Sequence, residues 1–157
     1  MTRTRTSTLL ALLLPAALLA GAWTAQLGFD LYPCEMCHWQ RWPHYAAVLV
    51  AAAALALPRR RRPLTLLAAG LIAVSGVIAV MHAGVEYGWW HGFTSCTSTI
   101  RLTGATAAER LDQIMAAPLV RCDHAPWTFA GISLAGFNAI LSLGGALVIA
   151  MMTRKAR

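Results

Sequence analysis

Charged residues are scarce in this chain of 157 residues: Asp, Glu, Lys and Arg together make up 12% of it. An ordinary soluble domain carries about 25% charged residues, whereas hydrophobic residues here reach 58%. A single soluble core of this size could not hide so many apolar side chains from water, which excludes an ordinary soluble globular enzyme. The composition therefore indicates that much of the chain lies in lipid.

Acidic residues are scarcer than basic ones, six against thirteen, and the formal net charge is +7. Such an excess can indicate nucleic-acid binding, but that function needs a basic face interleaved with aromatic side chains. Most Lys and Arg residues instead form short clusters at the ends of apolar runs. We therefore expect no nucleic-acid partner.

Long uncharged runs are present, and four of them approach the about 20 residues that a helix needs to cross a hydrocarbon core of about 30 Å. They lie at residues 9–29, 42–57, 64–85 and 127–153. The second run is short and must borrow residues on its N-terminal side, which places residues 34–41 at the membrane boundary. The sequence predicts an all-α, polytopic membrane four-helix bundle that forms a single membrane domain over residues 1–157.

The positive charges predict how the chain is oriented, because Lys and Arg accumulate on the cytoplasmic side of membranes. Nine of the thirteen lie near the chain ends or between the second and third runs: Arg3, Arg5, Arg59–Arg62, Arg154, Lys155 and Arg157. All six acidic residues fall in the other two loops, residues 30–41 and 86–126. We expect cytoplasmic termini and two outer loops. A cleavable signal peptide ending near residues 20–22 is an alternative, but the apolar run continues through Leu27.

The second outer loop is long enough to hold structure of its own. Residues 106–109 form a capping box, the signature of a helix start, and Pro118 ends the segment. Three apolar residues between these points share one helical face: Leu111, Ile114 and Met115. The pattern predicts a short amphipathic helix that lies flat on the membrane surface. Alternatively, it covers the mouth of the bundle as a soluble loop helix.

Cysteine is rare, and all four cysteines fall in the predicted outer loops, at Cys34, Cys37, Cys96 and Cys122. Disulfides persist in that compartment, so these four should pair, with three connectivities possible. Two structural disulfides are one interpretation. However, a C-x-x-C disulfide closes too small a loop to stabilise the fold much, and the same spacing at a helix N-terminus favours redox turnover. We therefore predict that Cys34 and Cys37 are redox-active.

Two metal-centred alternatives compete with thiol chemistry. A zinc site needs four converging ligands, and Cys96 and Cys122 lack the close spacing of a second zinc knuckle, so we expect no metal. Cys34, Cys37 and His38 match C-x-x-C-H, the attachment pattern of c-type haem. A porphyrin would be crowded against the membrane span, and the other two cysteines would have no role. These two points disfavour haem, and we keep a membrane c-type cytochrome as the alternative function.

Two polar residues, Arg41 and His44, follow the motif into the second apolar run. With Cys34 and Cys37 they form one helical stripe, provided that Pro43 does not break the helix. A cation at this depth is costly and usually functional, and Arg41 could stabilise both a thiolate and the developing anion of a reduced quinone. We predict that Arg41 and His44 bind a quinone cofactor. The alternative for Arg41 is a side chain that reaches up to lipid headgroups, and the alternative for His44 is a side chain at the membrane interface with no role in binding.

Several segments resemble the DsbB family, quinone-dependent thiol oxidases of the bacterial inner membrane that act in disulfide-bond formation. Residues 33–41 carry C-x-x-C followed by x-x-Gln-Arg. Further matching segments are His82–Glu86 leading to Cys96, Arg121–Asp123, Trp127, Gly131–Leu134 and Asn138. His38 departs from the aromatic residue often found after the inner cysteine. His82 and Glu86 are spaced i, i+4, and they could pair with each other or shuttle protons.

The resemblance implies a two-step thiol relay in a quinone-dependent protein-disulfide oxidoreductase. A reduced periplasmic thioredoxin-fold oxidase resembling DsbA would attack a disulfide between Cys96 and Cys122. Cys34 and Cys37 would reoxidise that pair through a transient link from Cys34 to Cys122. Cys37 would pass the electrons to ubiquinone or menaquinone, with Arg41 stabilising the reduced ring. Such a partner is strongly oxidising, at about −120 mV, and only an acceptor of higher potential can reoxidise it.

Overall fold

Helices dominate the structure, as the long apolar runs predict. It is a computed structural model that describes residues 2–92, 103–116 and 120–155. Its α-helices are α1 (Thr2–Gly28), α2 (Glu35–Ala56), α3 (Arg61–Glu86), α4 (Ala107–Ala116) and α5 (Leu134–Lys155). A 3-10 turn, η1 (Pro58–Arg60), joins α2 to α3, and two short strands, β1 (Thr128–Phe129) and β2 (Ile132–Ser133), precede α5.

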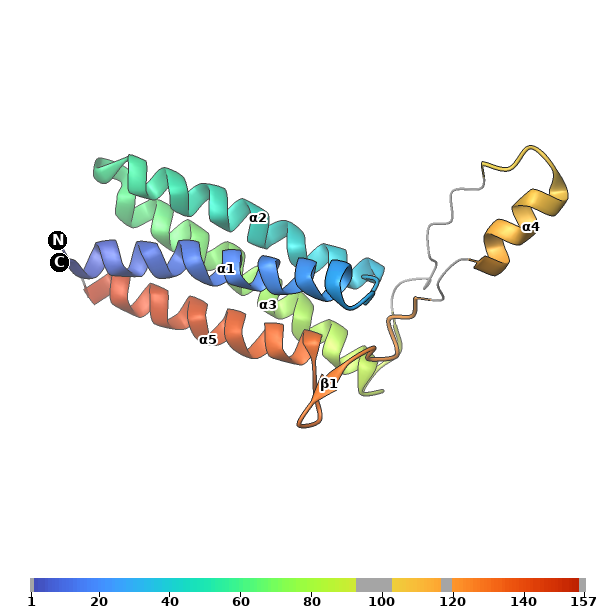
Figure 1. Cartoon of the computed structure of the whole chain (residues 1–157). Coiled ribbons are helices and arrows are strands. Elements are labelled where there is room, and N and C mark those ends of the chain that lie inside the picture. The colour runs from blue at the N-terminus through green and yellow to red at the C-terminus, as the bar shows by residue number, and fades with distance from the viewer. Residues whose placement is uncertain (1, 93–102, 117–119, 156–157) are drawn as a thin grey trace.

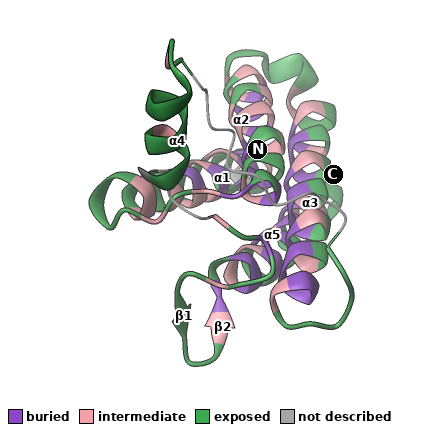
Figure 2. Cartoon of the chain, turned by 90° about the vertical axis from the view of Figure 1, so that its right-hand side faces the viewer, coloured by how far each residue is buried: buried purple, intermediate pink, exposed green. Residues whose placement is uncertain are grey.

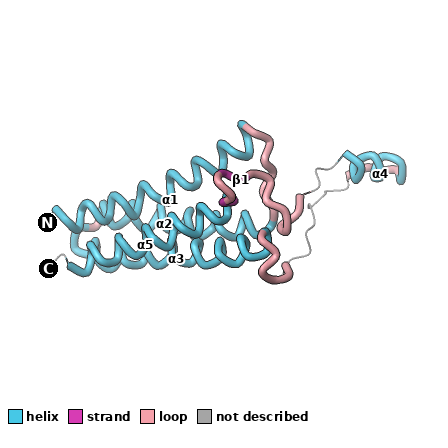
Figure 3. Tube along the Cα trace, turned by 90° about the horizontal axis from the view of Figure 1, so that it is seen from below, coloured by secondary structure: helices cyan, strands magenta, loops and turns pink. Residues whose placement is uncertain are grey.

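The four long helices α1, α2, α3 and α5 lie side by side, with both chain ends at one end of the group (Figure 1). Helix α3 packs most extensively against α5 and α2, and α1 packs against α2 and α5. The loops that carry the described cysteines lie at the opposite end of the helices from the termini (Figure 3). This arrangement gathers the first and second outer loops in one place.

Each long helix has both buried and exposed residues along its length (Figure 2), and many of the exposed ones are large and apolar, while many of the buried ones are small. Leu49 is 71% exposed and Leu147 60%, whereas Ala47 and Ala51 are fully buried. Small residues at helix contacts let backbones approach closely, which is typical of helices that pack in lipid. Within the described residues, three helical segments are long and apolar enough to cross a membrane: Arg3–Gly28, Pro58–Glu86 and Leu134–Lys155. The all-α fold is therefore that of a helical membrane protein.

Helix α2 differs from the predicted second span, residues 42–57. It extends upstream to Glu35, as the shortness of the apolar run required, and it continues through Pro43 without a break. The polar residues of its first half lower its mean hydropathy, and α2 is not among the three candidate spans. Because those residues belong to one continuous helix, Arg41 and His44 do share a face, and both are buried.

The fourth predicted span, residues 127–153, is wrong at its start, because β1 and β2 form a hairpin there. The strands pair Thr128 with Ser133 and Phe129 with Ile132. Ala130 and Gly131 connect them with φ angles of 51° and 78°, the left-handed pair that a tight hairpin turn requires. The Oγ atom of Ser133 then accepts a hydrogen bond from the N–H of Gly136 at 3.1 Å, which caps the start of α5.

The predicted capping box of α4 is confirmed. The N–H of Glu109 donates to Oγ1 of Thr106 at 3.2 Å, and the N–H of Thr106 donates to Oε2 of Glu109 at 3.1 Å. The apolar residues of this helix, Leu111, Ile114 and Met115, are all exposed. Helix α4 stands apart from the four long helices (Figures 1 and 3). It does not cover the mouth of the bundle, and its docking on a membrane surface stays a prediction.

The close contact between α3 and α5 depends on Gly76. A methyl group added there would lie 2.8 Å from Cγ and 3.1 Å from the backbone nitrogen of Leu143. Gly76→Ala should therefore lower the free energy of unfolding by about 1–3 kcal/mol, the usual penalty for overpacking. Chemical unfolding in detergent, followed by circular dichroism, measures this change.

Gly70→Ala is the matched control on the same helix, because a methyl group there meets open space. It should raise the free energy of unfolding by up to about 1 kcal/mol, the helix-propensity difference between the two residues. Equal stabilities of the two variants would contradict the assigned role of Gly76.

Candidate functional site

The C-x-x-C motif forms the start of α2. Cys34 is the N-cap residue, and its Sγ atom accepts a hydrogen bond from the N–H of Cys37 at 3.3 Å. The two Sγ atoms are 3.1 Å apart, with the Cys34 thiol donating to Cys37. A disulfide bond would measure about 2.05 Å, so the pair is present as two thiols. Cys34 is buried and Cys37 half-buried.

The contact between these two sulfur atoms separates their pKa values. Both cysteines lie outside the predicted membrane span, which begins at residue 42. The hydrogen bond donated by Cys34 lowers the pKa of Cys37, while the same bond and burial raise the pKa of Cys34. Because the thiolate is the reactive form of cysteine, Cys37 is the more nucleophilic member of the reduced pair.

Removing the thiol of Cys34, which donates the hydrogen bond, should abolish the lowering of the pKa of Cys37. In a protein whose other cysteines are serine, Cys34→Ala takes away the hydrogen bond, so the pKa of Cys37 should rise toward the ordinary value of about 8.5. The thiolate fraction of Cys37 at neutral pH then falls, and its alkylation profile moves to higher pH. Iodoacetamide labelling between pH 5 and pH 10, roughly the range in which thiols titrate, measures the shift. Coincident profiles with and without Cys34 would contradict the assignment.

His82 from α3 lies directly against the motif. Its Nε2 atom is 3.4 Å from Sγ of Cys34 and 3.7 Å from Oε1 of Glu86. The sulfur of Cys122, brought in by the second outer loop, also joins this cluster. Sγ of Cys34, a ring nitrogen of His82 and Sγ of Cys122 all lie within 4.8 Å of one another. Two of the predicted catalytic cysteines are thus neighbours, although they are far apart in sequence, while Cys96 lies outside the described residues.

Glu86 is held in place from the other side of the site. Its side chain is 3% exposed, and one of its carboxylate oxygens accepts a hydrogen bond from the hydroxyl of Ser133. The neighbouring Tyr87 accepts from the N–H of Ser133 at 2.8 Å and donates to the carbonyl of Gly131 at 3.2 Å. The β1–β2 hairpin is therefore tied to the end of α3, next to the cysteines.

Arg41 points toward α1 and is 9% exposed. Its guanidinium donates to Oε1 of Gln26 at 2.7 Å and to the carbonyl of Ala22 at 3.2 Å. It also lies 5.4 Å from the ring centroid of Trp23, within the range of a cation–π interaction. The arginine is thus fixed inside the helix group rather than extended to the surface.

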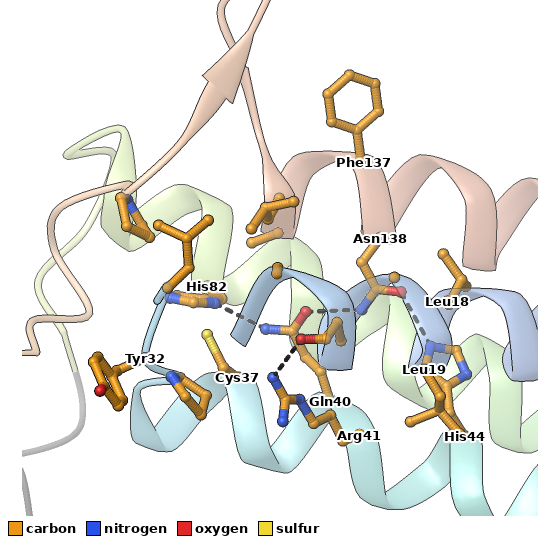
Figure 4. A pocket seen from close by; sticks show the side chains of 18 of the residues that line it. Leu18, Leu19, Tyr32, Cys37, Gln40, Arg41, His44, His82, Phe137 and Asn138 are labelled. Carbon is orange, nitrogen blue, oxygen red and sulfur yellow. Dashed lines mark hydrogen bonds between the residues drawn. The ribbon is translucent and has the colours of Figure 1, made fainter. Parts of the chain in front are cut away.

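A chain of polar side chains links His82 to His44 through the interior (Figure 4). Gln40 donates to Nδ1 of His82 at 2.8 Å and accepts from Asn138 at 2.8 Å. Nε2 of His44 lies 3.1 Å from Oδ1 of Asn138 and 2.9 Å from Oγ of Ser75. Nδ1 of His44 is buried without a hydrogen-bond partner among the described residues. Sequence reasoning assigned no role to Gln40, Asn138 or Ser75, whose signal was a polar residue inside an apolar helix.

Two cavities meet at this cluster. The first, of about 260 Å³, lies between the long helices, where apolar residues of α1 and α5 form much of its wall. Its polar lining residues are Cys37, Gln40, Arg41, His44, His82, Glu86 and Asn138. The second cavity, of about 380 Å³, lies at the loop end of the helices. Residues 30–37 and residues 120–126 contribute most of its lining. Cys37, His82 and Glu86 line both cavities, so they form the wall between them.

Comparison with known proteins decides the family. A family model described as disulfide bond formation protein DsbB matches residues 4–152, nearly the whole chain. The chain belongs to the DsbB family. A relative described as uncharacterized protein RP370, from Rickettsia prowazekii (strain Madrid E), is 24% identical over 126 residues, which cover 80% of this chain and 73% of the relative. No solved structure matches.

Membership in the DsbB family confirms the resemblance drawn from the motif at residues 33–41. It identifies the chain as a membrane protein of disulfide bond formation with disulfide oxidoreductase activity. Cys34 and Cys37, which carried that resemblance, lie beside His82 in this site.

Proposed function

We propose that this DsbB-family protein reoxidises a periplasmic DsbA-like thioredoxin-fold oxidase and passes the electrons to a membrane quinone. The observation that carries the proposal is the position of Cys37 in the wall between two cavities. One cavity is bounded by the outer loops, where a protein partner can approach. The other lies among apolar helix faces, where a lipid-soluble acceptor can enter. A thiol that reaches both can connect the two reactions.

The first reaction is exchange between the two cysteine pairs. In the proposed cycle, the partner reduces the Cys96–Cys122 disulfide, and the thiolate of Cys122 then attacks Cys34 of an oxidised Cys34–Cys37 pair. A Cys34–Cys122 disulfide forms, and the electron pair of the broken bond stays on Cys37. The proximity of Cys34 and Cys122, whose sulfur atoms lie within 4.8 Å of each other, supports this choice of exchanging pair. Both sulfur atoms are buried, which protects the mixed disulfide from other thiols.

The second reaction takes place in the cavity among the helices. Its volume of about 260 Å³ is close to the lower end of the range of small-molecule sites, about 300–1,000 Å³. When bound, a ubiquinone or menaquinone supplies an acceptor for two electrons and two protons. Arg41 provides positive charge beside it, and Nδ1 of His44, which has no hydrogen-bond partner among the described residues, could accept a hydrogen bond from a hydroxyl of the reduced ring. Cys37 reaches the same cavity, and the hydrogen bond from Cys34 lowers the pKa of its thiol.

The proposed location is the bacterial inner membrane, with the cysteines on the periplasmic side and both termini in the cytoplasm. All four long helices would cross the bilayer, α2 with its polar first half at the outer boundary. The charge distribution supports this orientation, because the arginines of the termini and of the α2–α3 turn gather at one end (Figure 1). Helix α4 would rest on the outer membrane surface through its exposed apolar residues.

The experiment that tests the function follows the absorbance of a soluble quinone analogue in the presence of the purified protein in detergent. Adding a reduced DsbA-like oxidase should remove the quinone band, and Cys37→Ser should prevent this loss. His38→Ala is the matched control, since its exposed side chain lies outside the set of residues that line either cavity, and it should leave the rate unchanged. Failure of the intact protein to reduce quinone would reject the relay. A Soret band that disappears with His38→Ala would support the c-type cytochrome instead.

A further inference from the structure

Gln40 is a buried residue of the site to which the proposed relay gives no task. Its side chain is 6% exposed, and its amide makes three hydrogen bonds. The amide nitrogen donates to Nδ1 of His82 at 2.8 Å and to the carbonyl of Met36 at 3.2 Å. The amide oxygen accepts from Nδ2 of Asn138 at 2.8 Å. Because a carbonyl can only accept and an amide nitrogen only donates, these partners fix which way the Gln40 amide points.

The orientation of Asn138 is fixed in the same way. Its amide nitrogen also lies 3.3 Å from Oγ of Ser75, and its oxygen accepts from the hydroxyl of Ser142 at 2.7 Å. The hydrogen bonds around Asn138 and Gln40 therefore run in one direction. Asn138 donates to Gln40, and Gln40 in turn donates to Nδ1 of His82, which accepts the hydrogen bond.

This direction selects the tautomer of His82. A neutral imidazole carries one hydrogen, and the nitrogen that accepts a hydrogen bond is the one without it. Since Nδ1 accepts from Gln40, the ring hydrogen of neutral His82 is on Nε2. That atom faces Sγ of Cys34 at 3.4 Å and Oε1 of Glu86 at 3.7 Å. The backbone of Cys122 also forms a hydrogen bond with His82, so the sulfur and the carboxylate are not the only groups that compete for this N–H among the described residues.

We propose that Gln40 is a positioning residue for thiol–disulfide exchange, which it serves by holding His82 in the Nε2–H tautomer with that N–H directed at the sulfur of Cys34. The inference rests on the proposed exchange at Cys34 and adds a residue to it. In the proposed relay the thiolate of Cys96 attacks Cys122 of the mixed disulfide: the Cys96–Cys122 bond forms, the Cys34–Cys122 bond breaks, and its electron pair stays on the Cys34 sulfur. The N–H of His82 donates a hydrogen bond to that charge, and no proton is transferred.

Glu86 lies on the other side of the same N–H. While Cys34 is a neutral thiol, Nε2 of His82 is within hydrogen-bond distance of its sulfur, at 3.4 Å, and 3.7 Å from the carboxylate, but a neutral thiol is a weak acceptor. As negative charge develops on Cys34, the sulfur becomes the stronger acceptor, because hydrogen bonds to ionised groups are about twice as strong as neutral ones. The other titratable groups that lie beside His82 or line the two cavities with it are Asp30, Tyr32, Cys37, Arg41, His44, Arg121, Cys122 and His124.

The test measures the pKa of Cys34 in a protein whose other three cysteines are serine, without quinone or partner. Gln40→Met has a similar shape but cannot donate, so His82 is released from its tautomer and the pKa of Cys34 should rise by about one unit. Gln40→Glu places a carboxylate at Nδ1, which keeps a hydrogen on both ring nitrogens, so the pKa of Cys34 should fall. Alkylation rates against pH provide both values.

Opposite shifts in the two variants support the inference, since general damage to the site would move both in one direction. No shift, or shifts of the same sign, would overturn it.

His82→Phe offers a second test that does not depend on the folding of Gln40→Met. In the His82→Phe protein, Gln40→Glu should no longer change the pKa of Cys34, and a persisting shift would refute the tautomer mechanism. Thr65→Val, in a buried hydroxyl pair with Thr8 far from the site, should leave the pKa unchanged. Because no acceptor is added, these results are independent of whether the protein reduces quinone.

Discussion

Arg41→Ala is expected to raise the KM for a soluble quinone analogue by about 10- to 100-fold, the value of a charge-assisted hydrogen bond. The guanidinium carries the positive charge in the helix cavity that Cys37 also lines. Its removal takes away the group that would hold the carbonyl oxygen of the acceptor. The cysteines should still form their disulfides, because Arg41 contacts α1 and not the sulfur atoms. Steady-state rates with a reduced partner measure the change.

Arg41→Lys serves as the matched control for this prediction. Lysine keeps the charge but loses the planar fork of donors that reaches Gln26 and Ala22, so its KM should lie between those of the alanine variant and the intact protein. An unchanged KM in Arg41→Ala would show that the arginine has no part in binding the acceptor, and the alternative of a purely structural contact with Trp23 would then hold.

Cys96→Ser should abolish oxidation of the DsbA-like partner while leaving Cys34 and Cys37 able to react with quinone. The expected loss is complete, because thiol–disulfide exchange has no route without the attacked sulfur. A single-turnover measurement separates the two effects: chemically reduced Cys96→Ser protein should still discharge one pair of electrons into a quinone analogue. Steady-state turnover with the partner should fall to the uncatalysed background.

Cys37→Ser is the converse variant. It should still form a mixed disulfide with the partner through the second outer loop, but the quinone analogue should stay oxidised. Partner oxidation at the normal rate by Cys96→Ser, or quinone reduction by Cys37→Ser, would each break the proposed order of the relay.

Much of the helical structure can be read from local patterns. Uncharged runs predict α1 and α3 closely, and the capping box at residues 106–109 predicts the start of α4, because these signals depend on neighbouring residues alone. The hairpin at residues 128–133 escaped prediction for a physical reason. Its residues are as apolar as those of a membrane helix, and only the turn at Gly131 distinguishes the two.

The site is predictable only where a motif carries it. The spacing of Cys34, Cys37 and Arg41 is enough to predict from the sequence that a cysteine pair and a cation lie at the start of one helix, as the structure shows. The role of Gln40 depends on Asn138, a residue 98 positions away, and on the packing of α2 between its neighbours. No local pattern encodes such a contact. A polar residue inside an apolar run, as at Asn138, is the one available signal.

The wall formed by Cys37, His82 and Glu86 also has a consequence for the order of events during turnover. In the proposed relay one reactant reaches the wall from the loop end and the other from among the helices, so neither would have to be present while the other reacts. The protein would then store a pair of electrons in its thiols after the partner has departed. Initial-rate measurements at several concentrations of both reactants should then give parallel double-reciprocal lines, the pattern of a ping-pong mechanism.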